Sequence, residues 1–126
     1  MILLDTSVLI DALTGSQRLG PALRSALARG NRMAIPSLVL FEWRRGPRNP
    51  AELALQEALF PSDEAVSFGP SEAIGAAELY RSVGRSRSRE VDLAIAACAI
   101  ARGAELWTQN LADFIDIPGL SIHTPV

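Results

Sequence analysis

The chain has 126 residues, with 12 basic and 14 acidic side chains and a net charge of −2. This length suits one domain, so we expect residues 1–126 to form a single unit. All 12 basic residues are arginines, and the chain has one histidine and one cysteine. A catalytic lysine and a cysteine-rich zinc site are therefore excluded, and a histidine-based triad or zinc site is disfavoured. With this acidic balance, any binding of nucleic acid must come from local arginine clusters.

The chain has no sequence signal for a membrane or for secretion. No apolar run reaches the roughly 18 residues that a membrane span requires, and no basic segment precedes the N-terminal apolar residues, so we expect no signal peptide. The single cysteine, Cys98, cannot form an internal disulfide, which fits a reducing compartment. These features predict a cytoplasmic location.

The N-terminal stretch predicts a buried strand that ends at a carboxylate. Residues 2–4 are apolar without alternation, which is typical of a strand covered on both faces. Asp5 follows, and Thr6 and Ser7 offer hydroxyls that can cap a helix starting with residues 8–10. Asp5 would then lie at the carboxyl end of a central strand, where open α/β sheets bind ligands. It can be a metal ligand, or it can only cap the helix or bind backbone N–H groups.

The next part of the chain alternates predicted helices with one short strand. Leucines recur at helical spacing up to Gly30, and Gly46-Pro47 ends a later apolar helix. The elements that we predict are a helix over 17–29, a strand over 32–35 and helices over 38–45 and 50–59.

Glu42 lies in the helix over 38–45, within an otherwise apolar sequence. Leu38 and Val39 lie one turn before it, so Glu42 shares part of an apolar face. A carboxylate in such a place is seldom buried without a partner. Glu42 is therefore a candidate ligand, and the alternative is that it points outward and pairs with Arg45.

A weaker third strand is predicted over 65–68 and another helix over 71–83, with Ile74, Leu79 and Tyr80 on or near its inner face. An arginine- and serine-rich segment comes next. It places four arginines within nine residues: Arg81, Arg85, Arg87 and Arg89. Such a loop can face phosphates, because Arg and Ser supply charged and neutral donors, or it can be a solvated surface turn.

The clearest helix covers residues 90–102 and is rich in Ala and Ile, so we expect it to be buried on most sides. Asp92 lies in its first turn, where the helix dipole favours a carboxylate even without a function. A strand over 105–108 follows, with Thr108, Asn110 and Asp113 at or just past its carboxyl end, and residues 120–124 can form an edge strand. This alternation predicts an α/β fold, with helices around a central, mostly parallel sheet.

The polar residues in apolar surroundings are mainly carboxylates. They are Asp5, Glu42, Asp92 and the pair Asn110 and Asp113. Carboxylates that converge on one crevice repel one another and raise each other's pKa unless a cation binds. Hard oxygen ligands suit Mg²⁺ or Mn²⁺, so this set predicts a divalent-metal site.

Several segments together resemble one known family. They are Ile2–Ile10, Ile35–Glu42, Asp92–Ala97 and Leu106–Phe114, followed by Pro118–Leu120. In this order they are similar to the PIN-domain ribonucleases, and most closely to the toxin subunits of VapBC-type toxin–antitoxin pairs. The resemblance implies a three-layer α/β/α fold, cleavage of RNA that depends on Mg²⁺ or Mn²⁺, a homodimer, and inhibition by a cognate antitoxin protein.

The same resemblance implies roles for individual residues. Asp5, Glu42 and Asp92 match the first, second and third acidic ligands, and Asn110 stands where many members have a fourth Asp. Asp113 is the candidate for the missing charge, directly or through water, or is only a turn residue before Phe114.

Other side chains would support these ligands. Thr108, and with it Thr6 or Ser7, would orient ligands or water. The arginines Arg81, Arg85, Arg87 and Arg89 would bind the RNA backbone, and water activated by the metal would attack the phosphodiester.

Two rival functions stay open at the level of sequence. The same carboxylates would serve a metal-dependent phosphatase or a DNA nuclease on a similar sheet. Asn110 in place of a fourth Asp also leaves room for a catalytically weak domain that binds RNA or a protein.

Overall fold

Four short parallel strands form the centre of the fold, in the order β2-β1-β3-β4. The computed structural model describes residues 1–125. The strands are β1 (Ile2–Leu4), β2 (Met33–Ala34), β3 (Glu105–Trp107) and β4 (Ser121–Ile122). β1 pairs with β2 on one side and with β3 on the other, with Leu4 opposite Trp107. The residues after β1 and β3 therefore emerge side by side at one edge of the sheet.

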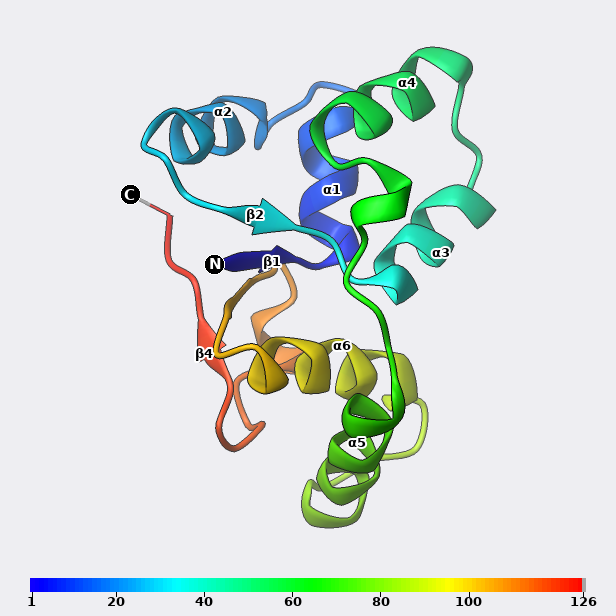
Figure 1. Ribbon diagram of the computed structural model, residues 1–126, viewed down its shortest axis with the longest axis vertical. Helices are drawn as coiled ribbons and strands as arrows, with labels where there is room; N and C mark the ends of the chain where they lie inside the picture. The colour runs from blue at the N-terminus through cyan, green and yellow to red at the C-terminus, as the bar shows by residue number, and fades with distance from the viewer. Residues whose placement is uncertain (126) are drawn as a thin grey trace.

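Helices cover both sides of this sheet (Figure 1). The helices are α1 (Thr6–Leu13), α2 (Gly20–Ala28), α3 (Ser37–Arg45), α4 (Pro50–Leu59), α5 (Pro70–Ser82) and α6 (Glu90–Ala101), with single 3₁₀ turns η1 (Ser62–Glu64) and η2 (Leu111–Asp113). Figure 1 shows α1 to α4 on one side and α5 and α6 on the other. The predicted α/β class with helices on both faces of a parallel sheet is confirmed.

The hydrophobic core follows the sheet and α6. Leu3 and Leu4 of β1 are fully buried, as expected for a strand covered on both faces. Every residue from Leu93 to Ala99 is buried, which confirms that α6 is enclosed on most sides. Burial raises the pKa of the Cys98 thiol, so Cys98 is an inert core residue. None of the helices within residues 1–125 is long and apolar enough to cross a membrane.

Two structural predictions were wrong. The segment 65–68 forms no strand, and only an isolated bridge joins Val66 to Pro36, because the chain turns into α5 soon afterwards at Gly69. Ile74 and Tyr80 of α5 are 64% and 38% exposed, whereas Leu79 is buried. This helix packs mainly on α6, so only a narrow stripe of it is covered.

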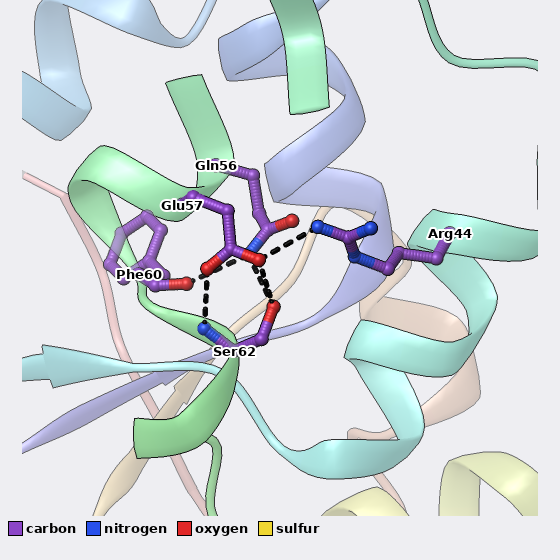
Figure 2. Close-up of polar contacts among 5 residues, drawn as sticks. All are labelled: Arg44, Gln56, Glu57, Phe60 and Ser62. Carbon is purple, nitrogen blue, oxygen red and sulfur yellow. Dashed lines mark hydrogen bonds and ion pairs between the residues drawn. The ribbon is translucent and has the colours of Figure 1, made fainter. Parts of the chain in front are cut away.

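A polar network joins α3 to α4 and η1 (Figure 2). Arg44 of α3 donates a hydrogen bond of 2.7 Å to Oε2 of Glu57, and Oε1 of Glu57 accepts from the backbone N–H of Ser62 at 2.8 Å. These bonds lower the pKa of the Glu57 carboxyl, with those from Ser62 the largest cause. Buried Gln56 donates to the carbonyl of Phe60 at 2.9 Å. The network fixes the end of α3, the helix that carries Glu42.

Candidate active site

Asp5 is a buried carboxylate at the carboxyl end of the central strand. It occupies the N-cap position of α1 and is only 4% exposed, yet its side chain makes no capping hydrogen bond. Its Oδ2 accepts hydrogen bonds from Ser7 at 2.9 Å and from Thr108 at 2.8 Å. The simple capping alternative is therefore wrong. The prediction that Thr6 and Ser7 cap this helix is also wrong, since both lie within its first turn.

Glu42 reaches the same edge of the sheet from α3. The hydroxyl of Thr6 donates a hydrogen bond of 2.6 Å to its Oε1. Oε2 lies 3.7 Å from Nη2 of Arg45, and the Glu42 side chain is 22% exposed. The expected pairing with Arg45 is thus present as a loose ion pair on the outer side of Glu42, and the side chain is also tied to the start of α1. Its role as a ligand stays a prediction.

Asp92 is the third member of the group, in the first turn of α6. Its pKa is raised to about 6, mainly because the carboxyl is desolvated and then because Asp5, Asp113 and Glu42 are nearby. Arg89 acts in the opposite direction but more weakly. The protonation of Asp92 therefore depends on the other candidate carboxylates, which come from separate parts of the chain.

The segment after β3 completes the rim of the site. Thr108 is buried, and its hydroxyl both donates to Asp5 and accepts from the backbone N–H of Asn110 at 2.9 Å. Asn110 and Asp113 are exposed, at the start and the end of η2. Gln109 was not predicted as a site residue, but its backbone N–H donates to Ser7 at 3.0 Å. A chain of hydrogen bonds thus joins the ends of β1 and β3.

Comparison with known families supports this geometry. A family model described as "PIN domain" matches residues 2–120. The chain belongs to the PIN domain family. Its relatives include Ribonuclease VapC19 of Mycobacterium tuberculosis, which is 36% identical over 123 residues and is matched over 95% of this chain and 97% of its own length. The predicted membership is therefore confirmed.

Solved structures give the same result for the fold. A chain of the VapBC2 complex from Rickettsia felis, bound to a promoter DNA fragment, has a TM-score of 0.76 and 26% identity, and all of both chains is covered. A chain of the DNA-bound VapBC complex from Salmonella typhimurium has a TM-score of 0.74 and 29% identity, with 97% of this chain and 96% of that chain covered. The three-layer architecture of this PIN domain is thus shared along the whole chain.

The four predicted RNA-binding arginines differ in their environments. Arg81, Arg85 and Arg87 are exposed, but Arg89 is only 9% exposed and forms an ion pair with Asp116. Arg89 was predicted to bind the RNA backbone. This prediction is wrong, because its guanidinium is buried and pairs with another residue of the protein. No local pattern in the sequence points to Asp116, which lies 27 positions away from its partner.

The candidate ligands of this PIN domain suit a hard cation, although their side chains do not converge on one point. Within residues 1–125, no three His, Cys, Asp or Glu side chains stand close enough to hold a metal ion. The donors are nevertheless all oxygens. The pKa of Asp92 is raised first by burial and then by the neighbouring carboxylates, and a cation would relieve both effects. Asp5, Glu42, Asp92 and Asp113 could hold the ion after side-chain rotation or through intervening water.

Proposed function

We propose that this PIN domain is an endoribonuclease that depends on Mg²⁺ or Mn²⁺ and acts as the toxin of a VapBC-type pair. The observation that carries the proposal is the meeting of carboxylates at one edge of the sheet, where Ser7 and Thr108 hold Asp5 and Thr6 holds Glu42. Asp92 lies beside them, and its pKa is raised mainly by burial and then by Asp5, Asp113 and Glu42. The similarity to Ribonuclease VapC19 over nearly the whole chain supports RNA as the substrate.

The chain's own residues divide the work of such a site. Ser7 and Thr108 hold one oxygen of Asp5, and Thr6 holds one oxygen of Glu42, so both carboxylates keep a fixed orientation. A divalent cation bound there would supply an activated water and neutralise charge on the phosphate. Arg81, Arg85 and Arg87 are free to meet the phosphates on either side of the scissile bond.

Within residues 1–125, no histidine or lysine side chain is placed to protonate the leaving oxygen. His123 lies 3.0 Å from Glu105, the first residue of β3, and it lines a cavity with residues of α2. The carboxylates instead follow the last residues of β1 and β3. We therefore expect water to supply the proton.

Two partners belong to the proposal. One is a cognate antitoxin, because two structural relatives over 25% identical are chains of VapBC complexes. The other is a second copy of this chain. Exposed apolar side chains lie on and beside α5 and α6, and they are Phe68, Ile74, Tyr80 and Val91. Such a surface suits a homodimer, which light scattering of the purified protein would detect. We place this activity in the cytoplasm, with its RNA and its antitoxin.

RNA cleavage by purified protein in Mg²⁺, Mn²⁺ or EDTA tests the activity. Asp5→Asn and Asp92→Asn should each reduce the rate by at least about 100-fold while far-UV circular dichroism stays unchanged, because each removes a charge that would hold the ion. Asp63→Asn in η1, an exposed residue, is the matched control and should cut RNA normally. Full cleavage by Asp5→Asn would refute the assignment.

The same assay separates the rivals. A phosphatase or DNA nuclease would act on a phosphomonoester or on single-stranded DNA and leave RNA intact. A binding module would retain RNA without cutting it, with or without the ion.

A further inference from the structure

The side chain of Arg89, near the site, makes several hydrogen bonds at once. It lies at the N-cap position of α6, and its guanidinium donates four hydrogen bonds. Two form a fork with the carboxylate of Asp116, at 2.6 and 3.0 Å. The others go to the carbonyl oxygens of Gly84 and Asp113, both at 2.9 Å. One buried side chain therefore joins the loop that precedes it to the segment 113–116, which lies 24 to 27 positions further along the chain.

The segments joined by Arg89 form the walls of a polar cavity of about 300 Å³. One wall is the loop 84–88, which contributes Arg85 and Arg87, and the other contains Asp113 and Ala112 from η2. Asp92 also lines this cavity. A basic wall and an acidic wall thus face the same space, beside the proposed ligand with the raised pKa.

The loop 84–88 needs such a tie because its backbone is strained. Arg85 and Ser88 have φ values of 52° and 65°, in the left-handed region that residues with a side chain rarely adopt. Arg89 opposes this strain from both ends, since its side chain binds Gly84 and its backbone N–H binds the carbonyl of Ser86 at 3.1 Å. On the other wall, the bond to the Asp113 carbonyl fixes the main chain from which that carboxylate projects.

We propose that Arg89 is a positioning residue that holds Asp113 and the loop 84–88 on opposite walls of the cavity beside Asp92. The inference rests on the proposed function of this site, and it replaces direct RNA contact by Arg89 with an indirect role. The planar fork is essential to it, because a lysine ammonium cannot direct donors to Asp116, Gly84 and Asp113 at once.

The test compares Arg89→Lys, Arg89→Met and Asp116→Asn with Arg102→Met. Arg102 forms the matched ion pair, at 3.1 Å from Glu72, and joins the other end of α6 to the start of α5. Three properties of the folded variants are measured: amide hydrogen exchange in residues 84–88 and 113–117, Mn²⁺ affinity by electron paramagnetic resonance, and affinity for single-stranded RNA in EDTA.

We expect Arg89→Lys and Arg89→Met to speed amide exchange in both segments and to weaken Mn²⁺ binding by about tenfold or more. RNA affinity should fall several-fold, because Arg85 and Arg87 lose their placement. Asp116→Asn should have a smaller effect, since the two carbonyl contacts remain. Arg102→Met should change none of the three properties at the cavity. Arg89→Lys added to Asp113→Asn should weaken Mn²⁺ binding little further, because both act through the same carboxylate.

Two results would overturn the proposal. One is wild-type amide exchange in both segments of folded Arg89→Lys. The other is faster exchange with unchanged Mn²⁺ and RNA affinity, which would make Arg89 purely structural. If the wild-type protein binds neither Mn²⁺ nor RNA, the proposed function fails, and the exchange data alone decide whether Arg89 holds the two walls.

Discussion

At the scale of single residues, the site depends on hydroxyl groups that hold carboxylates without neutralising them. Asp5 is nearly inaccessible, and a buried carboxylate costs several kcal/mol unless polar groups meet it. Ser7 and Thr108 both donate to Oδ2, and no donor within residues 1–125 is directed at Oδ1. Two neutral donors orient Asp5 while leaving its negative charge and one oxygen for a further partner.

Thr108→Val tests this arrangement, because valine keeps the shape of threonine and removes the hydroxyl. The variant should lose about 1.5–3 kcal/mol of stability, the usual contribution of a hydrogen bond to a charged group. Mn²⁺ affinity should fall about tenfold, since Asp5 loses part of its orientation. Urea unfolding in EDTA and Mn²⁺ titration measure the two effects. Thr108→Ser keeps the hydroxyl and should resemble the wild type, and equal losses in both variants would contradict the argument.

Asp92 predicts a pH dependence of the metal-free protein. Its pKa is about 6 when folded against an ordinary value of 3.8, so between these values the folded state binds more protons than the unfolded state. Stability in EDTA should therefore fall as pH rises from about 4 to about 6, and this contribution should be flat above pH 7. Urea unfolding at several pH values measures the slope. Asp92→Asn should remove this component, and an unchanged slope in that variant would refute the assignment.

The sequence was sufficient to predict which carboxylates share the site but not how each is held. Asp5 and Thr108 follow apolar runs, and parallel strands bring such positions to one edge. Arg89 looks like its neighbouring arginines in the sequence, and only the tertiary fold brings Asp116 to it. Long-range pairing of this kind leaves no local pattern, so the arginine with an internal role could not be separated from the exposed ones.

At the scale of elements, the close pairing of α5 and α6 depends on small residues. Gly75 lies within α5 and faces the side chain of Ala97 in α6. A Cβ added at Gly75 would lie 3.8 Å from the Cβ of Ala97, which is ordinary van der Waals contact. The interface therefore has room for one methyl group, although glycine is a poor helix former.

Gly75→Ala should stabilise the protein by about 0.5–1 kcal/mol, because alanine loses less backbone entropy in a helix and meets no clash. Thermal or urea unfolding measures the gain, and RNA cleavage should be unchanged. Gly103→Ala is the contrasting variant. Gly103 ends α6 with φ +59°, so an alanine there should destabilise by about 1–2 kcal/mol. Destabilisation by Gly75→Ala would contradict the argument that the interface has room for one methyl group.

Most helices and all four strands within residues 1–125 could be predicted, because leucine periodicity, glycine stops and apolar runs are local signals. A fifth strand, predicted over 65–68, is absent. The sequence there suits a strand, but only Val66 pairs with the chain, at Pro36. The exposed face of α5 was also misjudged. Ile74 and Tyr80 were predicted to lie on or near the inner face of this helix, but the sheet does not cover that side of it.

At the scale of the whole molecule, an acidic protein must bind a polyanion through a local concentration of positive charge. The net charge is −2, so the overall field gives no attraction. Arg81 stands near the end of α5. Arg85 and Arg87 stand in the following loop, where they line the cavity together with Asp92 and Asp113. Binding should therefore depend on where the arginines lie and not on their total number.

The double variant Arg85→Gln/Arg87→Gln separates position from net charge. For single-stranded RNA, each lost phosphate contact lowers the slope of log affinity against log salt by about 0.7. The pair should therefore lower the slope by about 1.4 and weaken binding to all sequences. Arg24→Gln/Arg29→Gln changes the net charge equally but lies on or beside the exposed face of α2, across the sheet from α5 (Figure 1). Fluorescence anisotropy in EDTA, at several salt concentrations, compares the two. Equal losses of affinity would mean that RNA binding depends only on net charge, and the proposed binding of RNA phosphates by Arg85 and Arg87 would be wrong.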